Sequence, residues 1–231
     1  MNQKYLKSLV CVGGVALGFN CAGQSAFYNN FPNYNGNAFS LISGQQIGNE
    51  ISLQNGTALT SFSIEYYSPN TTLAPTVGID VTFYNQNGPV VNGFKTPGTE
   101  FFNSGYYTGG AGGLGGGYQV VTFNTTDFAA GAQNGWGGNY SLPQDFTFSV
   151  SFTGLNALNV VDMPLANITP GTSYGDYWLN NGTGWTLMYN TSSDGNLVVD
   201  MVGTVPEPST FGLAALGGVA LLGFNKLRRR S

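Results

Sequence analysis

The feature that most restricts the fold of this chain is an alternation of apolar and polar residues with a period of two. In residues 77–84 and 146–152 every second side chain is apolar: Val77, Ile79, Val81, Phe83, Phe146, Phe148, Val150 and Phe152. Such alternation is typical of a β-strand with one face in a core. We therefore expect the apolar set to be buried, and the polar residues between them, such as Asp80 and Thr147, to face solvent.

Further strands are predicted by similar patterns between turn residues. They span residues 38–42, 47–53, 58–67, 100–107, 118–123, 160–163, 177–179, 185–189 and 197–202. In residues 58–67 we expect one face to carry Ala58, Thr60, Phe62, Ile64 and Tyr66. No stretch of the body has the apolar recurrence of an amphipathic helix, and abundant glycine disfavours helices. The expected fold is an all-β, single antiparallel β-sandwich of jelly-roll-like form, with a closed barrel as the alternative.

The N-terminal residues 1–26 have the features of a secretory signal peptide. Lys4 and Lys7 precede an apolar run over 9–19, and small residues at Cys21, Ala22, Gly23 and Ser25 offer cleavage sites. Cys21 raises the alternative of a lipoprotein, but Phe19 and Asn20 before it fit a lipobox poorly. Removal of this segment leaves a body over residues 27–204 without cysteine, so its stability must come from a core.

The C-terminal residues 205–231 combine a Pro206-Glu207-Pro208 tripeptide, an uncharged apolar run over 211–224 and a basic cluster of Lys226, Arg228, Arg229 and Arg230. The run is shorter than the roughly 20 residues that cross a bilayer comfortably, so we expect a single transmembrane helix to recruit its flanks, over about residues 209–227. The basic cluster should stop translocation and stay in the cytoplasm. The prolines keep the tripeptide extended and open to a protease. A helix packed in the core is the alternative, but such a helix would not usually end in a block of arginines.

This order of tripeptide, apolar segment and basic end resembles the PEP-CTERM sorting signal of Gram-negative bacteria. The resemblance implies that an exosortase, a membrane protease, recognises the motif Val205, Pro206, Glu207, Pro208 and Ser209 and cuts near it. It also implies passage through the export machinery, a transient inner-membrane anchor, and delivery to the cell surface or to an extracellular matrix of exopolysaccharide or biofilm. Residues 77–107 and 160–190 loosely resemble segments of exported PEP-CTERM proteins. The resemblance implies no defined activity.

The charge of the body argues against a nucleic-acid or anionic-lipid partner. Between residues 27 and 204, ten carboxylates face the single cation Lys95, which leaves a net charge of −9. Phosphate recognition needs lysine and arginine, so neither partner is expected. The few charges and the many Asn, Ser, Thr and Tyr residues are typical of an extracellular β-domain.

Catalytic chemistry has little support in the sequence. The chain has no histidine, which excludes Ser-His-Asp and Cys-His catalysis. The run from Gly110 to Gly115 formally matches a dinucleotide fingerprint, but a strand follows where a helix is required, so a flexible surface loop is expected. A glycosidase needs two opposed carboxylates. The candidates are Asp80, Glu100, Asp162 and Asp176, but their spacing does not pair them. We therefore expect no enzymatic activity and no cofactor.

Two kinds of binding site remain as hypotheses. A structural calcium ion could use Asp162 and Asp176, with oxygen atoms of Asn167, Asn180 and Asn181, although no known calcium motif is present. Glycan contacts are expected from Trp136, Tyr140, Trp178 and Trp185, with Trp136 the most exposed because glycines surround it.

The expected function is therefore that of a non-catalytic surface or matrix protein. The alternative is a carbohydrate-binding module acting on exopolysaccharide, which a coplanar row of exposed Tyr and Trp would favour. An ice-binding role is a distant third, because some ice-binding proteins resemble this chain in their tail, but no regular Thr-x-Thr ladder is present.

Overall fold

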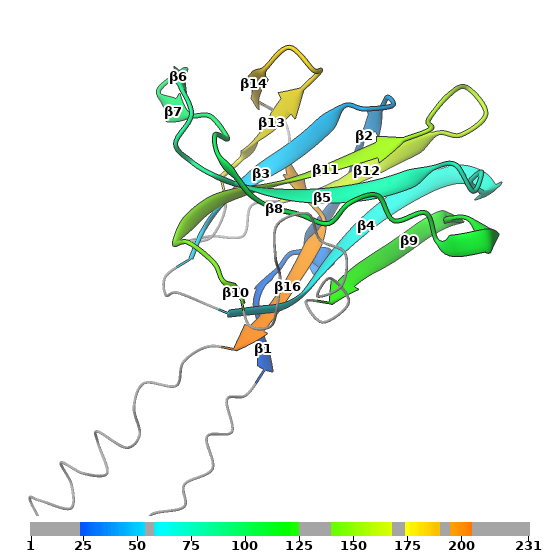
Figure 1. The fold of residues 1–231 in the computed structure, drawn as a ribbon, viewed down its shortest axis with the longest axis horizontal. Coiled ribbons are helices and arrows are strands. Elements are labelled where there is room, and N and C mark those ends of the chain that lie inside the picture. The colour runs from blue at the N-terminus through cyan, green and yellow to red at the C-terminus, as the bar shows by residue number, and fades with distance from the viewer. Residues whose placement is uncertain (1–23, 54–57, 125–139, 168–173, 190–194, 205–231) are drawn as a thin grey trace, which may run out of the picture. The chain divides into compact units, whose positions relative to one another are not determined.

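The computed structural model describes residues 24–53, 58–124, 140–167, 174–189 and 195–204, and the regular secondary structure of this part is almost entirely β-strand (Figure 1). The strands form an eight-stranded antiparallel sheet, a six-stranded antiparallel sheet and a two-stranded hairpin. No described segment is a helix long and apolar enough to cross a membrane. The signal peptide and the C-terminal helix predicted from the sequence lie outside the described residues, except that Gln24, Ser25 and Ala26 belong to the first strand.

The eight-stranded sheet is built around the long strand β4. It consists of β1 (Gln24–Asn29), β2 (Tyr34–Leu41), β4 (Ala58–Thr72), β9 (Gly115–Asn124), β10 (Tyr140–Ser141), β12 (Val161–Ala166), β15 (Asn196–Leu197) and β16 (Val199–Thr204). The strand β4 pairs with β16 and β12 and also with β9 and β10, whereas β1 is an edge strand paired only with β16. Figure 1 shows β4 and β9 side by side.

The six-stranded sheet has the order β14-β13-β3-β11-β5-β8. Its strands are β3 (Gln46–Ser52), β5 (Gly78–Asn85), β8 (Glu100–Asn103), β11 (Asp145–Thr153), β13 (Asp176–Asn180) and β14 (Trp185–Tyr189). The hairpin of β6 (Val90–Val91) and β7 (Phe94–Lys95) follows β5. Short 3-10 turns occur at Phe31–Asn33 and Gly110–Gly112.

The two sheets share one hydrophobic core. Phe62 of β4 packs its ring edge to face against Phe83 of β5 and Phe148 of β11, with ring centroids 5.5 and 5.2 Å apart. Tyr66 of β4 makes the same kind of contact with Phe152. Edge-to-face geometry is one of the favourable arrangements of aromatic pairs. Every residue predicted for the core is buried, which confirms that set: Phe62, Ile64, Val77, Ile79, Val81, Phe83, Phe146, Phe148, Val150 and Phe152. Two facing antiparallel sheets agree with the predicted sandwich.

The predicted inward face of β4 is wrong at its start. Leu59 is fully buried, whereas Ala58 and Thr60 are only half-buried. The cause is a register shift in the pairing with β16, where Ser61 faces Val202 but Leu59 faces Gly203. Such an irregularity inverts the alternation on one side of it. The faces therefore match the prediction only from Phe62 onward.

The prediction that polar residues of β5 and β11 face solvent is also wrong. Asp80, Thr82, Thr147, Ser149 and Ser151 all point away from the core, yet all are buried. Hydrogen bonds replace the missing water at Asp80, whose carboxylate accepts from Thr82, Asn103 and Ser104. A buried polar group needs such partners, and Asp80 is therefore a structural residue here.

Two buried asparagines make hydrogen bonds to segments that lie far away in the sequence. Asn49 of β3 donates through Nδ2 to the carbonyl of Asp176, 2.7 Å away, and accepts from the backbone N–H of Leu197, also at 2.7 Å. Asn30 donates to the carbonyl of Leu197 and accepts from the N–H of Val199. Asn49 therefore joins the six-stranded sheet to β15 of the other sheet.

The glycine run 109–117 contains an exposed turn at Gly110–Gly112, which agrees with the expected surface loop, but its second half belongs to strand β9. Its backbone leads directly into the strand β9, as expected, but it packs closely against the end of β4 and the residues after it. Gly113 has a φ of 69°, and a Cβ there would lie 2.4 Å from the carbonyl oxygen of Leu73. Glycine is required at this position both by its conformation and by the close approach.

Candidate functional site

The two ends of the folded body lie next to each other. Gln24, the first residue of β1, is the paired partner of Thr204, the last residue of β16. Thr204 is also paired with Ala58, the first residue of β4. The tripeptide that begins at Pro206 therefore follows the last strand after one intervening residue, Val205.

The outer face of the six-stranded sheet carries an acidic and aromatic cluster that we call the Glu50 cluster, comprising Glu50, Thr147, Asp176 and Trp178. Glu50 lies directly opposite Thr147 in the pairing of β3 with β11, and Trp178 lies opposite Gly48 in the pairing of β13 with β3. A Cβ at Gly48 would lie 2.4 Å from the carbonyl oxygen of Phe148, so this position of β3 needs glycine. Glu50, Asp176 and Trp178 are only 5%, 6% and 0% exposed.

Burial controls the protonation of these carboxyl groups. Desolvation raises the pKa of Glu50 from 4.5 to about 7, and the negative charges of Asp176 and Asp145 act in the same direction. Desolvation also raises the pKa of Asp176. The Trp178 indole lies close enough to lower the pKa of Glu50, although its Nε1 makes no contact with the geometry of a full hydrogen bond. The hydroxyls of Thr147 and Ser149 are likewise buried without a partner in the described residues. Glu50 is therefore poised to carry a proton near neutral pH.

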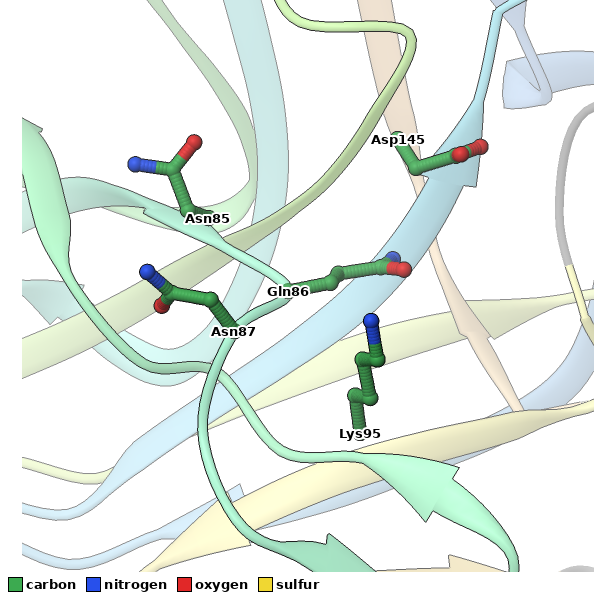
Figure 2. Close-up of a pocket in the computed structure, with 5 residues that line it drawn as sticks. All are labelled: Asn85, Gln86, Asn87, Lys95 and Asp145. Carbon is green, nitrogen blue, oxygen red and sulfur yellow. The ribbon is translucent and has the colours of Figure 1, made fainter.

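A hollow lies at the end of this sheet beside the β6–β7 hairpin (Figure 2). Asn85, Gln86, Asn87, Lys95 and Asp145 line its volume of about 370 Å³. The hairpin turns at Asn92 and Gly93, which both have positive φ, and β7 supplies Lys95 to the hollow. Asp145 accepts a hydrogen bond from the Ser52 hydroxyl at 2.6 Å. The hollow is polar and open, so it lacks the apolar lining typical of a small-molecule site.

The outer face of the eight-stranded sheet carries a second group of aromatic residues, which we call the tyrosine cluster: Tyr34, Tyr67 and Tyr118. Tyr67 and Tyr118 are paired across β4 and β9, with ring centroids 4.8 Å apart and planes inclined by 47°. The hydroxyls of Tyr34 and Tyr118 lie 3.3 Å apart. This contact, burial and the nearby Glu65 raise the pKa of Tyr34 to about 12, so the phenol stays neutral. The three rings are not coplanar, but they form one continuous aromatic surface.

Carboxylates flank the tyrosine cluster. Asp162 of β12 is the cross-strand partner of Tyr67 and accepts a hydrogen bond from the Ser40 hydroxyl. Glu65 occupies the next outward position of β4 and faces Val120 of β9. Burial raises the pKa of Glu65.

Of the four residues proposed for glycan contact, the structure describes the side chains of Trp178 and Trp185. Trp178 is fully buried, so its ring faces are not available to a sugar. Trp185 is half-buried and packs its edge against Tyr84, with ring centroids 5.5 Å apart. Trp136 and the side chain of Tyr140 lie outside the described residues.

The residues proposed for calcium do not converge either. Asp162 lies on the outer face of the eight-stranded sheet and Asp176 on that of the six-stranded sheet, so they cannot share one ion. Asn181 accepts a hydrogen bond from Gln45, and Asn180 accepts from the N–H of Gly182. In the described part of the chain, no three carboxylates are grouped as a metal site would need.

Sequence reasoning selected Asp176 and Trp178 for other kinds of site, but it missed Glu50, Tyr34 and Tyr118. Glu50 carried no signal, because an acid at an outward strand position is ordinarily solvated. Tyr34 lies before the first strand expected there, which the prediction began at residue 38, although β2 begins at Tyr34. The hairpin could have been found, since Asn92-Gly93 is a strong turn signal between short apolar pairs.

Comparison with known proteins identifies the C-terminal segment. The family model described as the PEP-CTERM protein-sorting motif matches residues 204–230. The chain carries a PEP-CTERM sorting motif. The match begins at Thr204, the last residue of β16, so the PEP-CTERM motif follows the described β-structure directly. No curated protein matches the chain.

The sorting motif indicates how the protein is exported and processed. It implies export and sorting in a membrane-anchored form before release to the surface, and it implies processing by exosortase, a membrane protein. The motif residues Val205 to Ser209 and the membrane stop formed by Lys226, Arg228, Arg229 and Arg230 lie outside the described residues.

Proposed function

We propose that this PEP-CTERM protein is a non-catalytic component of the cell surface or extracellular matrix, whose body is a jelly-roll-like β-sandwich. The observation that carries the proposal is the sorting motif, which matches residues 204–230 immediately after the last strand. In this account residues 1–26 contain the export signal, residues 205–231 form a temporary anchor, and exosortase releases the body.

The arrangement of carboxylates supports a role without catalysis. A glycosidase needs two carboxyl groups on either side of a bound sugar. Asp80 is enclosed by its own hydrogen bonds, and Asp162 and Asp176 lie on different sheets. Glu50 and Asp176 share one face, but both are buried, so a sugar cannot lie between them in this conformation.

Comparison of the native host with a strain that lacks its exosortase tests the proposal. We expect the protein at the cell surface of the native host, and a longer form retained in the inner membrane of the deletion strain. Equal surface delivery in both strains would contradict exosortase-dependent sorting. Turnover of any polysaccharide by the purified protein, lost on changing Glu50→Gln or Asp176→Asn, would contradict the non-catalytic role.

A further inference from the structure

The exposed outer face of the eight-stranded sheet carries a row of side chains with the chemistry of a sugar-binding surface. The pairings Ser40 with Asp162, Asp162 with Tyr67, and Tyr67 with Tyr118 place four side chains in line across β2, β12, β4 and β9. Adjacent strands lie about 4.8 Å apart, so the row is roughly 14 Å long. We infer that this row, with Tyr34, binds an uncharged polysaccharide chain.

The aromatic part of the row supplies the stacking surface. Tyr118 is 55% exposed and Tyr67 is half-buried beside it. An apolar ring face with a polar hydroxyl suits the C–H face and the hydroxyls of a pyranose. The two ring planes are inclined by 47°, so they do not present one flat face of the kind that a flat crystalline surface would need.

The polar part of the row supplies hydrogen-bond acceptors. The carboxylate of Asp162 accepts from Ser40 and lies next to Tyr67, so an oxygen on the exposed side can accept from a sugar hydroxyl. Tyr34 is held over the sheet by the contact of its hydroxyl with that of Tyr118. A few polar groups around an apolar platform are the usual composition of a ligand site.

The negative charge of this surface favours uncharged ligands over anionic ones. Asp162 and Glu65 are the ionisable groups that flank the tyrosines, and the single lysine of the body, Lys95, lies on the β6–β7 hairpin, which follows β5 of the other sheet. Anionic polysaccharide, anionic lipid and a second copy of this acidic body are therefore repelled. An uncharged polysaccharide avoids this repulsion and donates hydroxyl hydrogen bonds to the carboxylates.

The row lies far along the sheet from the end at which the described chain begins and ends. Gln24, Thr204 and Ala58 mark the end of the sheet from which the sorting motif continues. With a rise of about 3.3 Å per residue, Tyr67 lies roughly 30 Å along β4 from Ala58. The inference rests on the proposed surface or matrix function only for the source of the ligand.

Affinity electrophoresis of the full-length chain tests the inference directly. The protein is purified in a detergent without a sugar headgroup and run through gels that contain a mixed-linkage β-glucan, a galactomannan, dextran or the anionic alginate. We expect at least one of the three uncharged polymers to retard the protein, and alginate not to. Tyr118→Ala should weaken the retarding interaction at least tenfold, whereas Tyr118→Phe should keep most of it because the ring remains.

Tyr106→Ala is the matched control, since Tyr106 is 52% exposed but lies outside the row. It should bind like the unmodified chain, and all variants should keep the same melting temperature. Failure of all three uncharged polymers to retard the protein would overturn the inference, as would equal effects of Tyr118→Ala and Tyr106→Ala. Processing of the tail is read separately by mass spectrometry, so loss of sorting and loss of glycan binding are distinguishable.

Discussion

Gln24 and Thr204, which begin and end the described body, are directly opposite each other in the antiparallel pairing of β1 with β16. Because β16 lies between β1 and β4, the chain enters and leaves the body at one end of the eight-stranded sheet. The body can therefore fold completely while it is still joined to both flanking segments. This arrangement agrees with the proposed removal of an N-terminal export signal and of the C-terminal sorting signal.

The position of β1 leads to a prediction about signal cleavage. We expect the mature chain to begin at Gln24, because a cut after Gly23 keeps the whole of β1 and leaves Cys11 and Cys21 in the discarded segment. A cut after Ser25 would remove two residues that pair with Gly203 and Thr204. Mass spectrometry of the N-terminal peptide measures this directly. A first residue at Phe27 or later would show that the edge strand is not retained intact.

We predict that truncation of the Phe148 side chain strongly destabilises the fold. This side chain is fully buried and contacts Phe62 across the two sheets, so Phe148→Ala should lower the free energy of unfolding by about 3–5 kcal/mol through the cavity it leaves. Urea denaturation of the two proteins gives the difference. Leu158→Ala, at a side chain that is 80% exposed, is the control and should change it by less than about 0.5 kcal/mol. Equal stability of Phe148→Ala and the unmodified protein would contradict the shared core.

Glu50 predicts an unusual dependence of stability on pH. Its pKa is raised to about 7 in the folded state, so the folded protein binds a proton more tightly than the unfolded chain between about pH 4.5 and 7. The free energy of unfolding should therefore fall as the pH rises through this interval. After allowance for partial solvation, we expect Glu50 to contribute about 1–2 kcal/mol of this loss.

Glu50→Gln removes the charge and tests this directly. The variant should be more stable than the unmodified protein at pH 8 and similar to it at pH 4.5, although Asp176, Asp200 and Glu65, whose pKa values are also raised, leave a smaller slope of the same sign. Melting curves across this pH range provide the measurement. Glu100→Gln, at an exposed position of β8, is the control. A variant that melts lower than the unmodified protein at pH 8 would show that the charged form of Glu50 stabilises the fold.

The sequence predicts the burial of the inward-facing strand residues better than that of the outward-facing ones. The inward residues of β5 and β11 were predictable, because alternation over Val77–Phe83 and Phe146–Phe152 reports burial directly. The outward residues were not, since a period of two cannot tell a solvated face from one that is covered by its own long side chains. Thr147 and Glu50 are buried for this second reason, among Trp178, Tyr84 and their neighbours.

The candidate sites were also hard to predict from the sequence, because they are formed by residues from separate strands. Sequence reasoning selected Trp136, Tyr140, Trp178 and Trp185 for glycan contact from residue type, but Trp178 is fully buried, in a strand whose pairing with β3 no local pattern encodes. The tyrosine cluster joins residues 34, 67 and 118, and their proximity depends on a strand order that no local pattern encodes. The tail, in contrast, was recognisable because its signal is contiguous in the sequence.

The tail predicts different outcomes for its two functional parts. Changing Pro206, Glu207 and Pro208 to alanine should leave export intact but trap the uncut protein in the inner membrane, because the extended recognition segment is lost. Deletion of residues 226–230 should instead let the short apolar run pass through the bilayer, since no positive stop remains. Fractionation and immunoblotting of the native host separate these results. Normal surface release of the alanine variant would show that the tripeptide is not the recognised element.

We expect the C-terminal anchor to be temporary. Mass spectrometry of the surface-exposed protein from the native host tests it most directly, through the C-terminal peptide. We predict a C-terminus near the Pro206-Glu207-Pro208 tripeptide, with Arg228, Arg229 and Arg230 absent. An intact chain that ends at Ser231 would contradict processing and would mean that the surface protein keeps its membrane segment.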